Sequence, residues 1–169
     1  GFKGEYYQLE KFPVEPATLS QIPIIIGGGG KVKTPTLAGK YSEEFNIYAG
    51  PKDTLQNSIN LFKSVASENG RDEKALEITT ACPPVVGLTK ESVDNSLISA
   101  AKALIQPEDE IAKNWQERSY LYGTPEDVVK TLSMWQEVGI EAVYLQLLDL
   151  EPSKRDESVE VIQKAINLL

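Results

Sequence analysis

Hydrophobic residues in this chain follow two patterns, short continuous runs and longer stripes at helical spacing. Short runs rich in Ile, Val, Leu and aromatic residues predict buried strands, here at residues 24–26, 45–48, 76–81 and 142–148. Stripes at helical spacing predict helices, here over about 35–42, 53–69, 89–105 and 124–139, and from Ser153 onward. A strand followed by a helix therefore recurs four times along the chain.

This alternation favours a parallel sheet with right-handed crossover connections. Strands rich in Ile, Val and Leu are typical of a sheet that is buried on both faces. A complete barrel takes about 250 residues, so a chain of 169 residues is too short for one. The expected fold class is α/β, half of a TIM (β/α)8 barrel. Because the first and last strands would expose their edges, we expect pairing with a missing amino-terminal half or self-association to a dimer.

Two segments fall outside the strand–helix repeat, although all 169 residues are treated as one unit. Residues 1–22 carry scattered aromatic residues, together with prolines that block regular helix, which predicts an extended arm packed on a surface. Residues 83–122 are too long for a simple connection and are expected to form a helical insertion before the last strand. Within it, Trp115 and Tyr120 are expected to be packed aromatic residues.

The most distinctive stretch is a glycine run at the end of the first predicted strand. Four glycines follow Ile24–Ile26 directly and leave the backbone bare, and Lys31 and Lys33 add positive charge. Thr34 and Pro35 have the pattern of an N-cap followed by proline at the first helical position. A bare backbone at a helix N-terminus presents amide N–H groups to an anion, and phosphate is the expected one. The alternative is a flexible glycine turn with two solvated lysines.

Charge and composition narrow the range of partners and chemistry. The net charge of −8 and the pI near 4.7 argue against nucleic acid and anionic membranes as main partners. No run approaches the roughly 18 apolar residues of a membrane span, the start has no signal-peptide core, and we expect a cytoplasmic protein. With no histidine and a single cysteine, the chain lacks the usual general base and any multi-cysteine zinc site. Any chemistry would therefore have to use carboxylates, lysines, tyrosines, backbone groups or a cofactor that brings its own reactivity.

A few further positions carry side chains with chemical potential, and each also has an ordinary structural explanation. Asn46 can bind a ligand from a strand end, but we expect it to satisfy neighbouring backbone groups. Glu43 and Glu44 are expected on a solvated edge, and the direction of Glu77 is left open. Cys82 is expected to be a small buried apolar residue.

Several motifs are similar to those of a known family. They are Phe2-x-Gly4-x-Tyr6-Tyr7, the Pro23–Gly30 run, Thr36-Leu37-Ala38-x-x-Tyr41, Phe45-Asn46 and the helix start Gly123–Val129. At this spacing they resemble the luciferase-like monooxygenase family, and within it the branch that depends on the deazaflavin coenzyme F420. The resemblance covers essentially the whole chain.

The resemblance implies an eight-stranded barrel in which this chain supplies strands five to eight. It implies that the first four strands, which provide much of the ring-binding and substrate pocket, are missing here. It also implies a coenzyme phosphate held by Gly27, Gly28, Gly29, Gly30, Lys31, Lys33, Thr34 and Thr36. The implied cofactor is coenzyme F420 or FMN, with a small-molecule substrate that the sequence does not identify.

Two functions remain as hypotheses. The first is a flavin- or deazaflavin-dependent oxidoreductase of the luciferase-like monooxygenase type, present as a carboxyl-terminal fragment that binds the coenzyme phosphate and is inactive alone. Because the chain begins at Gly1 rather than methionine, we expect it to be processed, cloned or cut from something longer. The second is a truncated, non-catalytic homologue that acts as a ligand-binding or protein-interaction module.

Overall fold

The structure is a computed structural model that describes residues 1–11, 20, 22–147 and 152–169. Its strands are β1 (Phe2–Lys3), β2 (Gln8–Leu9), β3 (Ile25–Gly28), β4 (Glu44–Tyr48), β5 (Glu77–Cys82), β6 (Val85–Val86), β7 (Tyr122–Gly123) and β8 (Ala142–Leu145). Its helices are α1 (Lys33–Tyr41), α2 (Lys52–Glu68), the 3-10 turn η1 (Glu73–Ala75), α3 (Lys90–Leu104), α4 (Glu108–Glu117), α5 (Pro125–Val138) and α6 (Pro152–Ile166).

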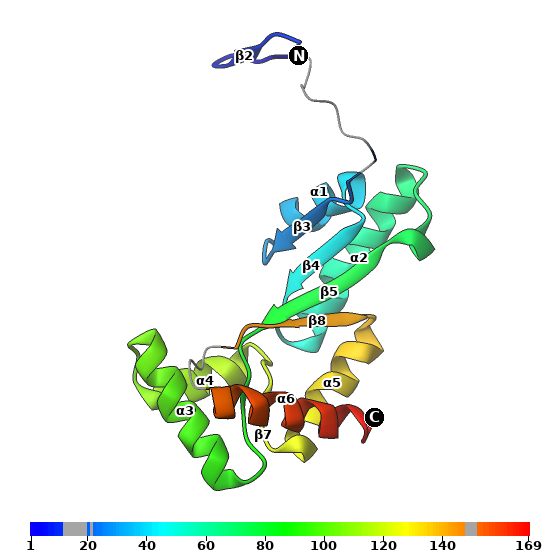
Figure 1. The fold of residues 1–169 in the computed structure, drawn as a ribbon. Helices are drawn as coiled ribbons and strands as arrows, with labels where there is room; N and C mark the ends of the chain where they lie inside the picture. The colour runs from blue at the N-terminus through cyan, green and yellow to red at the C-terminus, as the bar shows by residue number, and fades with distance from the viewer. Residues whose placement is uncertain (12–19, 21, 148–151) are drawn as a thin grey trace.

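The central element is a four-stranded parallel sheet in the order β3-β4-β5-β8 (Figure 1). Each strand is followed by at least one helix, so the four predicted strand–helix units are confirmed. Within the described residues, β3 and β8 each have a neighbour on one side only. The fold class is therefore α/β, with the sheet and helices of half a (β/α)8 barrel.

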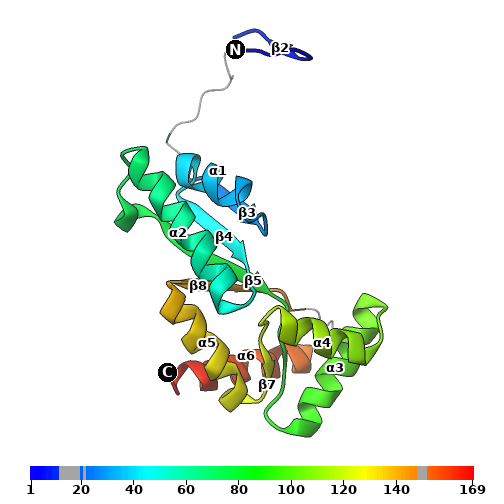
Figure 2. The same cartoon turned by 180° about the vertical axis from the view of Figure 1, so that it is seen from behind.

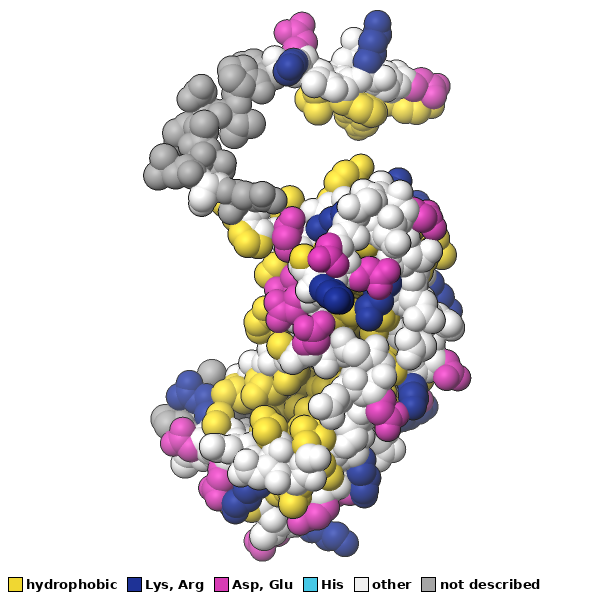
Figure 3. All heavy atoms as spheres, turned by 90° about the vertical axis from the view of Figure 1, so that its right-hand side faces the viewer, with side chains coloured by type: hydrophobic (Ala, Val, Ile, Leu, Met, Phe, Trp, Pro, Cys, Tyr) yellow, Lys and Arg dark blue, Asp and Glu magenta, His cyan; other side chains and the backbone are white. Residues whose placement is uncertain are grey.

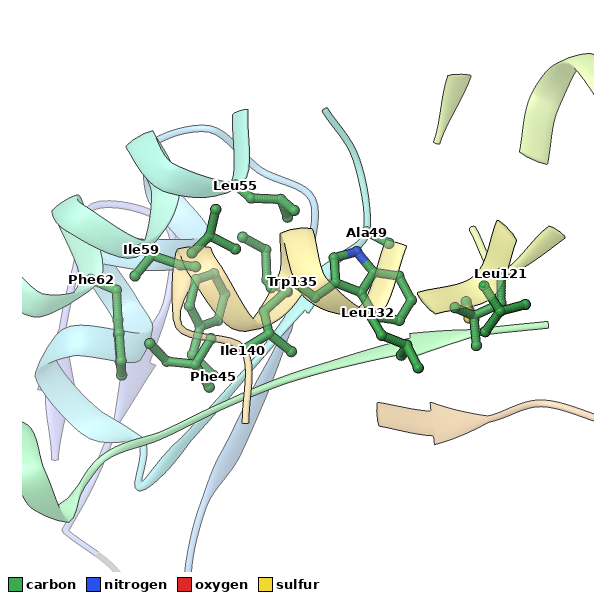
Figure 4. Close-up of a cluster of buried hydrophobic side chains, with 14 of the residues drawn as sticks. Phe45, Ala49, Leu55, Ile59, Phe62, Leu121, Leu132, Trp135 and Ile140 are labelled. Carbon is green, nitrogen blue, oxygen red and sulfur yellow. The ribbon is translucent and has the colours of Figure 1, made fainter. Parts of the chain in front are cut away.

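Helices α1, α2, α5 and α6 cover one face of this sheet and pack on one another in that order. In Figure 1 the strands lie in front of α2, and from behind, in Figure 2, α2 lies in front of β4. The core between the two layers includes Phe45, Phe62 and Trp135, and the rings of Phe45 and Phe62 lie 5.2 Å apart (Figure 4). Burial of these large apolar side chains holds the helices on the sheet.

The other face of the sheet, which we call the inner face, carries the alternate residues of each strand. Its members are Ile25, Gly27, Glu44, Asn46, Tyr48, Glu77, Thr79, Ala81, Ala142 and Tyr144. In the described part of the chain no helix covers it (Figure 1), and Ile25 and Tyr144 are about half exposed there, at 55% and 49%. The inner face would lie inside a closed barrel.

Residues 83–122, where a helical insertion is predicted, contain the helices α3 and α4. Strands β6 and β7 pair in parallel beside α3 and α4. A second small core contains Val85, Ile111 and Trp115. The rings of Trp115 and Tyr120 meet edge to face at 5.4 Å, so the packed aromatic residues are confirmed.

Three predictions about elements are wrong in detail. The first strand is not buried on both faces, since Ile24 and Ile25 are half exposed, because β3 is an edge strand. The predicted last strand, residues 142–148, ends at Leu145, and residue 148 of that prediction lies outside the described residues. The predicted arm begins with an antiparallel hairpin, β1 and β2, whose apolar side chains are exposed. Residues 12–19 and 21 of that arm also lie outside the described residues.

In the described part of the chain, no helix has the length and the apolar character needed to cross a membrane.

Candidate functional site

The glycine run lies at the carboxyl edge of the sheet, where ligands bind in parallel α/β folds. Gly27 and Gly28 belong to β3, and Gly29 and Gly30 begin the loop to α1. The N-cap of α1 is Val32, so the predicted cap at Thr34 is wrong. Pro35 is therefore the third residue of α1 and not the first. Proline is tolerated there because the amides of the first turn have no acceptor within the helix.

Three positions in the run require glycine, one because of its backbone conformation and two because of close contacts. Gly28 has φ of +144°, a conformation that residues with a side chain rarely adopt. A Cβ on Gly29 would lie 2.8 Å from Cδ2 of Tyr48, and one on Gly30 would lie 2.5 Å from Oγ1 of Thr34. The loop therefore follows its neighbours more closely than any side chain allows.

The amides from Gly29 to Thr34 donate no hydrogen bond within the described residues. The first amide of α1 with an internal acceptor is that of Thr36, which donates to the carbonyl of Val32 at 3.1 Å. A helix ordinarily leaves four such amides at its start, and here the preceding loop extends the row. These N–H groups and the positive end of the α1 dipole form a site suited to an anion.

A cavity of about 190 Å³ lies beside the start of this loop. Its lining includes Gly28, Gly29, Tyr48, Gly50 and, at the end of α4, Glu117 and Arg118. Arg118 follows α4 directly, and its guanidinium forms no ion pair among the described residues. Arg118 is exposed, and Glu117 is paired with Lys113 at 3.8 Å, so a cation that is unpaired in the described part of the chain lines the same cavity as the bare backbone.

The other predicted site residues are less close to the cavity. Lys31 and Lys33 are exposed and form no ion pair in the described part of the chain. Thr34 lies beside Gly28 and Gly30. Thr36 donates its hydroxyl to the carbonyl of Val32 at 2.7 Å, so its proton is already used within the helix. Gly27 lies in the strand, opposite Asn46, and does not line the cavity.

Sequence reasoning missed Arg118 and Tyr48. Arg118 lies in the segment predicted to be an insertion, far along the chain from the glycine run, and only the folded structure brings the two together. Tyr48 carries a partial signal, since it ends the second predicted strand and therefore lies at the same sheet edge as Gly28.

The inner face carries a connected set of polar side chains. Asn46 donates from Nδ2 to Oγ1 of Thr79 at 2.8 Å, and Thr79 donates to Oε1 of Glu44 at 2.5 Å. Tyr144 donates from its hydroxyl to Oε2 of Glu44 at 3.2 Å, and this bond, with some desolvation, raises the pKa of Tyr144. Asn46 therefore bonds a side chain rather than the expected backbone groups.

Glu44 and Cys82 differ in how well the sequence anticipated them. The expectation of a solvated Glu44 is wrong, because its side chain faces this network and the residue is only 7% exposed. Glu77, whose direction was open, lies exposed on the same face. Cys82 is fully buried as expected, and desolvation raises the pKa of its thiol to about 11, which leaves it protonated and unreactive at neutral pH.

A larger cavity, of about 680 Å³, lies between α3, α4 and α5. Its charged lining consists of Lys90, Asp94, Asp127 and Lys130, two of each sign, so it offers no net field to an anion. Among the described residues, no group of three or more acidic or cysteine side chains is placed to hold a metal ion. The row of amides that have no acceptor in the described part of the chain is what distinguishes the glycine-loop cavity, which is therefore the candidate site.

Residues 1–142 match the sequence model of the luciferase-like monooxygenase family. This chain belongs to that family. No curated protein sequence matches it.

Solved structures give the same fold at low sequence identity. An F420-dependent secondary alcohol dehydrogenase, solved with an F420-acetone adduct, matches 97% of this chain and 55% of its own, with a TM-score of 0.69 and 23% identity. A coenzyme F420-dependent tetrahydromethanopterin reductase from Methanopyrus kandleri matches 87% of this chain and 51% of its own, with a TM-score of 0.62 and 15% identity. A riboflavin lyase, solved with modified FMN and riboflavin, matches 85% of this chain and 42% of its own, with a TM-score of 0.59 and 13% identity. This chain thus spans about half the length of the structures that it matches.

Proposed function

We propose that this chain binds the phosphate of coenzyme F420 or FMN at its glycine loop, as the carboxyl-terminal half of an oxidoreductase. The observation that carries the proposal is the row of amides from Gly29 to Thr34 that have no internal acceptor at the carboxyl edge of the sheet. Such a row binds a dianion without any acid–base side chain.

The residues around the loop fit a phosphate. Arg118 lines the same cavity as Gly28 and Gly29, and a guanidinium can pair with two phosphate oxygens at once. Lys31 and Lys33 add positive charge at the rim, and Thr34 has a hydroxyl beside the loop. A side chain on the loop glycines would push into Tyr48 or Thr34 and change the shape of this cradle.

The coenzyme class is supported by the structural neighbours. Two of them are described as F420-dependent enzymes, and a third was solved with modified FMN. When bound, a deazaflavin or flavin supplies hydride transfer, and the residues of this chain hold its phosphate and thereby fix its position. The substrate would be a small molecule, as in the F420-acetone adduct of the dehydrogenase.

The open sheet supports a partner that completes the barrel. Both β3 and β8 have unpaired edges among the described residues, and the matched structures contain about as much chain again as this one covers. An amino-terminal half-barrel or a second copy of this chain would pair with those edges. The half-barrel alone would bind the phosphate but lack most of the substrate pocket.

A titration of the purified chain with coenzyme F420, FMN and inorganic phosphate tests the proposal, read by coenzyme fluorescence and thermal stability. Arg118→Gln should weaken coenzyme binding about tenfold, because a charge-assisted hydrogen bond is lost. Arg155→Gln, an exposed arginine on α6, is the matched control and should leave the affinity unchanged. Binding of none of the three ligands, or equal losses in both variants, would overturn the phosphate site.

Turnover separates the two hypotheses for the whole protein. Coenzyme binding with hydride transfer after addition of a complementary half supports the oxidoreductase. Coenzyme binding that never yields turnover supports a non-catalytic, ligand-binding homologue.

A further inference from the structure

The inner face of the sheet carries negative charge that nothing on the sheet compensates. Glu44 and Glu77 are direct neighbours in the β4–β5 register, both on this face. Glu44 is 7% exposed, and its oxygens accept hydrogen bonds from Thr79 and Tyr144. Those neutral hydroxyls stabilise the carboxylate without neutralising it. The strands β3, β4, β5 and β8 contain no lysine or arginine.

Closing a second sheet over this face would remove both carboxylates from water. The loss of hydration is unfavourable for each buried ion unless a cation with good geometry lies close enough to pair with it. A second copy of this chain would bring two further carboxylates into the same space and no strand cation. Self-closure is therefore opposed by like charge.

Apolar surface beside the two unpaired strands indicates a protein partner rather than a small ligand. Ile24 and Ile25 are half exposed at the β3 edge. At the β8 edge, on the helix-covered side of the sheet, a groove of about 550 Å³ is lined by Val143 and by residues of α5 and α6, and it reaches Ile166 and Leu169, which are more than half exposed. Figure 3 shows a hydrophobic hollow in its lower half. Exposed apolar patches beside unpaired strands are typical of docking surfaces.

We propose that the inner face docks a half-barrel sheet that places a lysine or arginine against Glu44 and Glu77, and that this charge pairing selects it over a second copy. The proposal rests on the partner inferred under the proposed function and decides between its two forms. Apolar contact along the edges provides the attraction, and the two carboxylates provide the selection.

Charge variants of this chain test the selection, with sedimentation and native mass spectrometry as readouts. Glu77→Lys makes the inner face neutral overall and should self-associate with a dissociation constant at least about tenfold lower than that of the wild type. At concentrations at which this variant dimerises, the wild type should remain monomeric. Glu73→Lys carries the same change in net charge on η1, off the sheet, and should behave as the wild type. An equimolar mixture of isotope-labelled wild type with Glu77→Lys should form heterodimers at a lower concentration than wild-type homodimers.

Glu77→Gln provides a second measurement in case the lysine variant does not fold, as judged by circular dichroism. It halves the uncompensated charge and should dimerise more tightly than the wild type. Wild-type dimers as tight as those of either variant, or no association in any of them, would overturn the proposal. Coenzyme affinity, measured in the same samples, reports on the proposed function alone, because Glu77 does not line the phosphate cavity.

Discussion

At the scale of single residues, the candidate site depends on side chains that are absent as much as on those present. The amides of the loop are accessible because Gly29 and Gly30 leave room for Tyr48 and Thr34 to lie against the backbone. That role follows from the sequence, since four successive glycines after a strand predict a bare, sharply bent backbone. Arg118 does not follow from it, because its approach to the loop depends on how α4 packs.

Ile105 has a backbone conformation that is unfavourable for its side chain. It caps the end of α3 in the left-handed region, with φ of 55°, and is 92% exposed. A β-branched side chain there costs about 1–2 kcal/mol, and exposure means that its removal loses little packing. Ile105→Gly should therefore raise the free energy of unfolding by about 1 kcal/mol, measured by urea denaturation. Ile98→Gly, in the middle of the same helix, is the control and should destabilise; a loss of stability in Ile105→Gly would contradict the argument.

Cys82 should make stability depend on pH in the alkaline range. Burial raises the pKa of its thiol to about 11 in the folded state, against 9.0 for an ordinary thiol. Between these values the unfolded chain loses the proton while the native chain keeps it, so stability falls as pH rises from about 9 to about 11. The part due to Cys82 is on the order of 2 kcal/mol.

Urea denaturation at about pH 8 and about pH 10.5 measures this loss. Cys82→Ala removes the thiol and should show a smaller decline between the two conditions. The comparison cancels the titration of lysines and tyrosines, which both proteins share. Equal declines would show that the thiol ionises as readily in the folded chain as in the unfolded one.

At the scale of elements, local signals predicted helix starts and long-range pairing decided the rest. The α5 start is confirmed as expected, because Thr124 and Asp127 bond each other within one turn. Gly123 before it has φ of +109°, and a Cβ there would lie 2.8 Å from Cβ of Asp127. The predicted start of α1 was wrong because Thr34 and Pro35 suit either of two positions in a first turn, and the sequence does not choose between them.

The exposure of β3 was missed because the burial of a strand depends on whether another strand lies beside it, which the sequence of the strand does not show.

Asp127→Ala should destabilise the start of α5. Asp127 accepts from the Thr124 hydroxyl at 3.2 Å and from Lys130 at 2.9 Å, and these bonds lower its pKa. Their loss should reduce the free energy of unfolding by about 1 kcal/mol. Because the pKa is lowered, this contribution is present at neutral pH and is lost as pH falls through the acidic range.

Urea denaturation at neutral and acidic pH measures this effect. Glu108→Ala, in the first turn of α4, is the control and should cost less, since Glu108 makes no hydrogen bond within the described residues. A difference between wild type and Asp127→Ala that stays constant down to about pH 2 would contradict the ionic part of the argument.

At the scale of the whole molecule, the sequence predicted the number and direction of the strand–helix units but not their surroundings. The four units and their parallel order are confirmed, because each depends on periodicity within a short window. The polar network of Glu44, Thr79 and Tyr144 was not foreseen, because its members come from three strands far apart in the chain. Its presence on an open face is what makes the partner's charge a testable property.

The hairpin of residues 1–11 gives the last prediction, since it stands apart from the rest of the molecule. Figure 1 shows it well away from the sheet, and Phe2, Tyr6 and Tyr7 are each more than half exposed. In Figure 3 its hydrophobic side chains gather on the side turned toward the body. If the body does not use that surface, a chain that begins at residue 20 should melt within about 2 °C of the full chain.

Thermal unfolding followed by circular dichroism measures this difference, with Phe45→Ala as a positive control. Phe45 is fully buried, so the control should lose about 3–5 kcal/mol and melt on the order of 10 °C lower. A decrease of more than about 5 °C on removing the hairpin would place its apolar face on the body in solution. An unchanged melting temperature would show that the hairpin does not stabilise the body of the isolated chain. Its exposed aromatic face would then be available to the partner that completes the barrel.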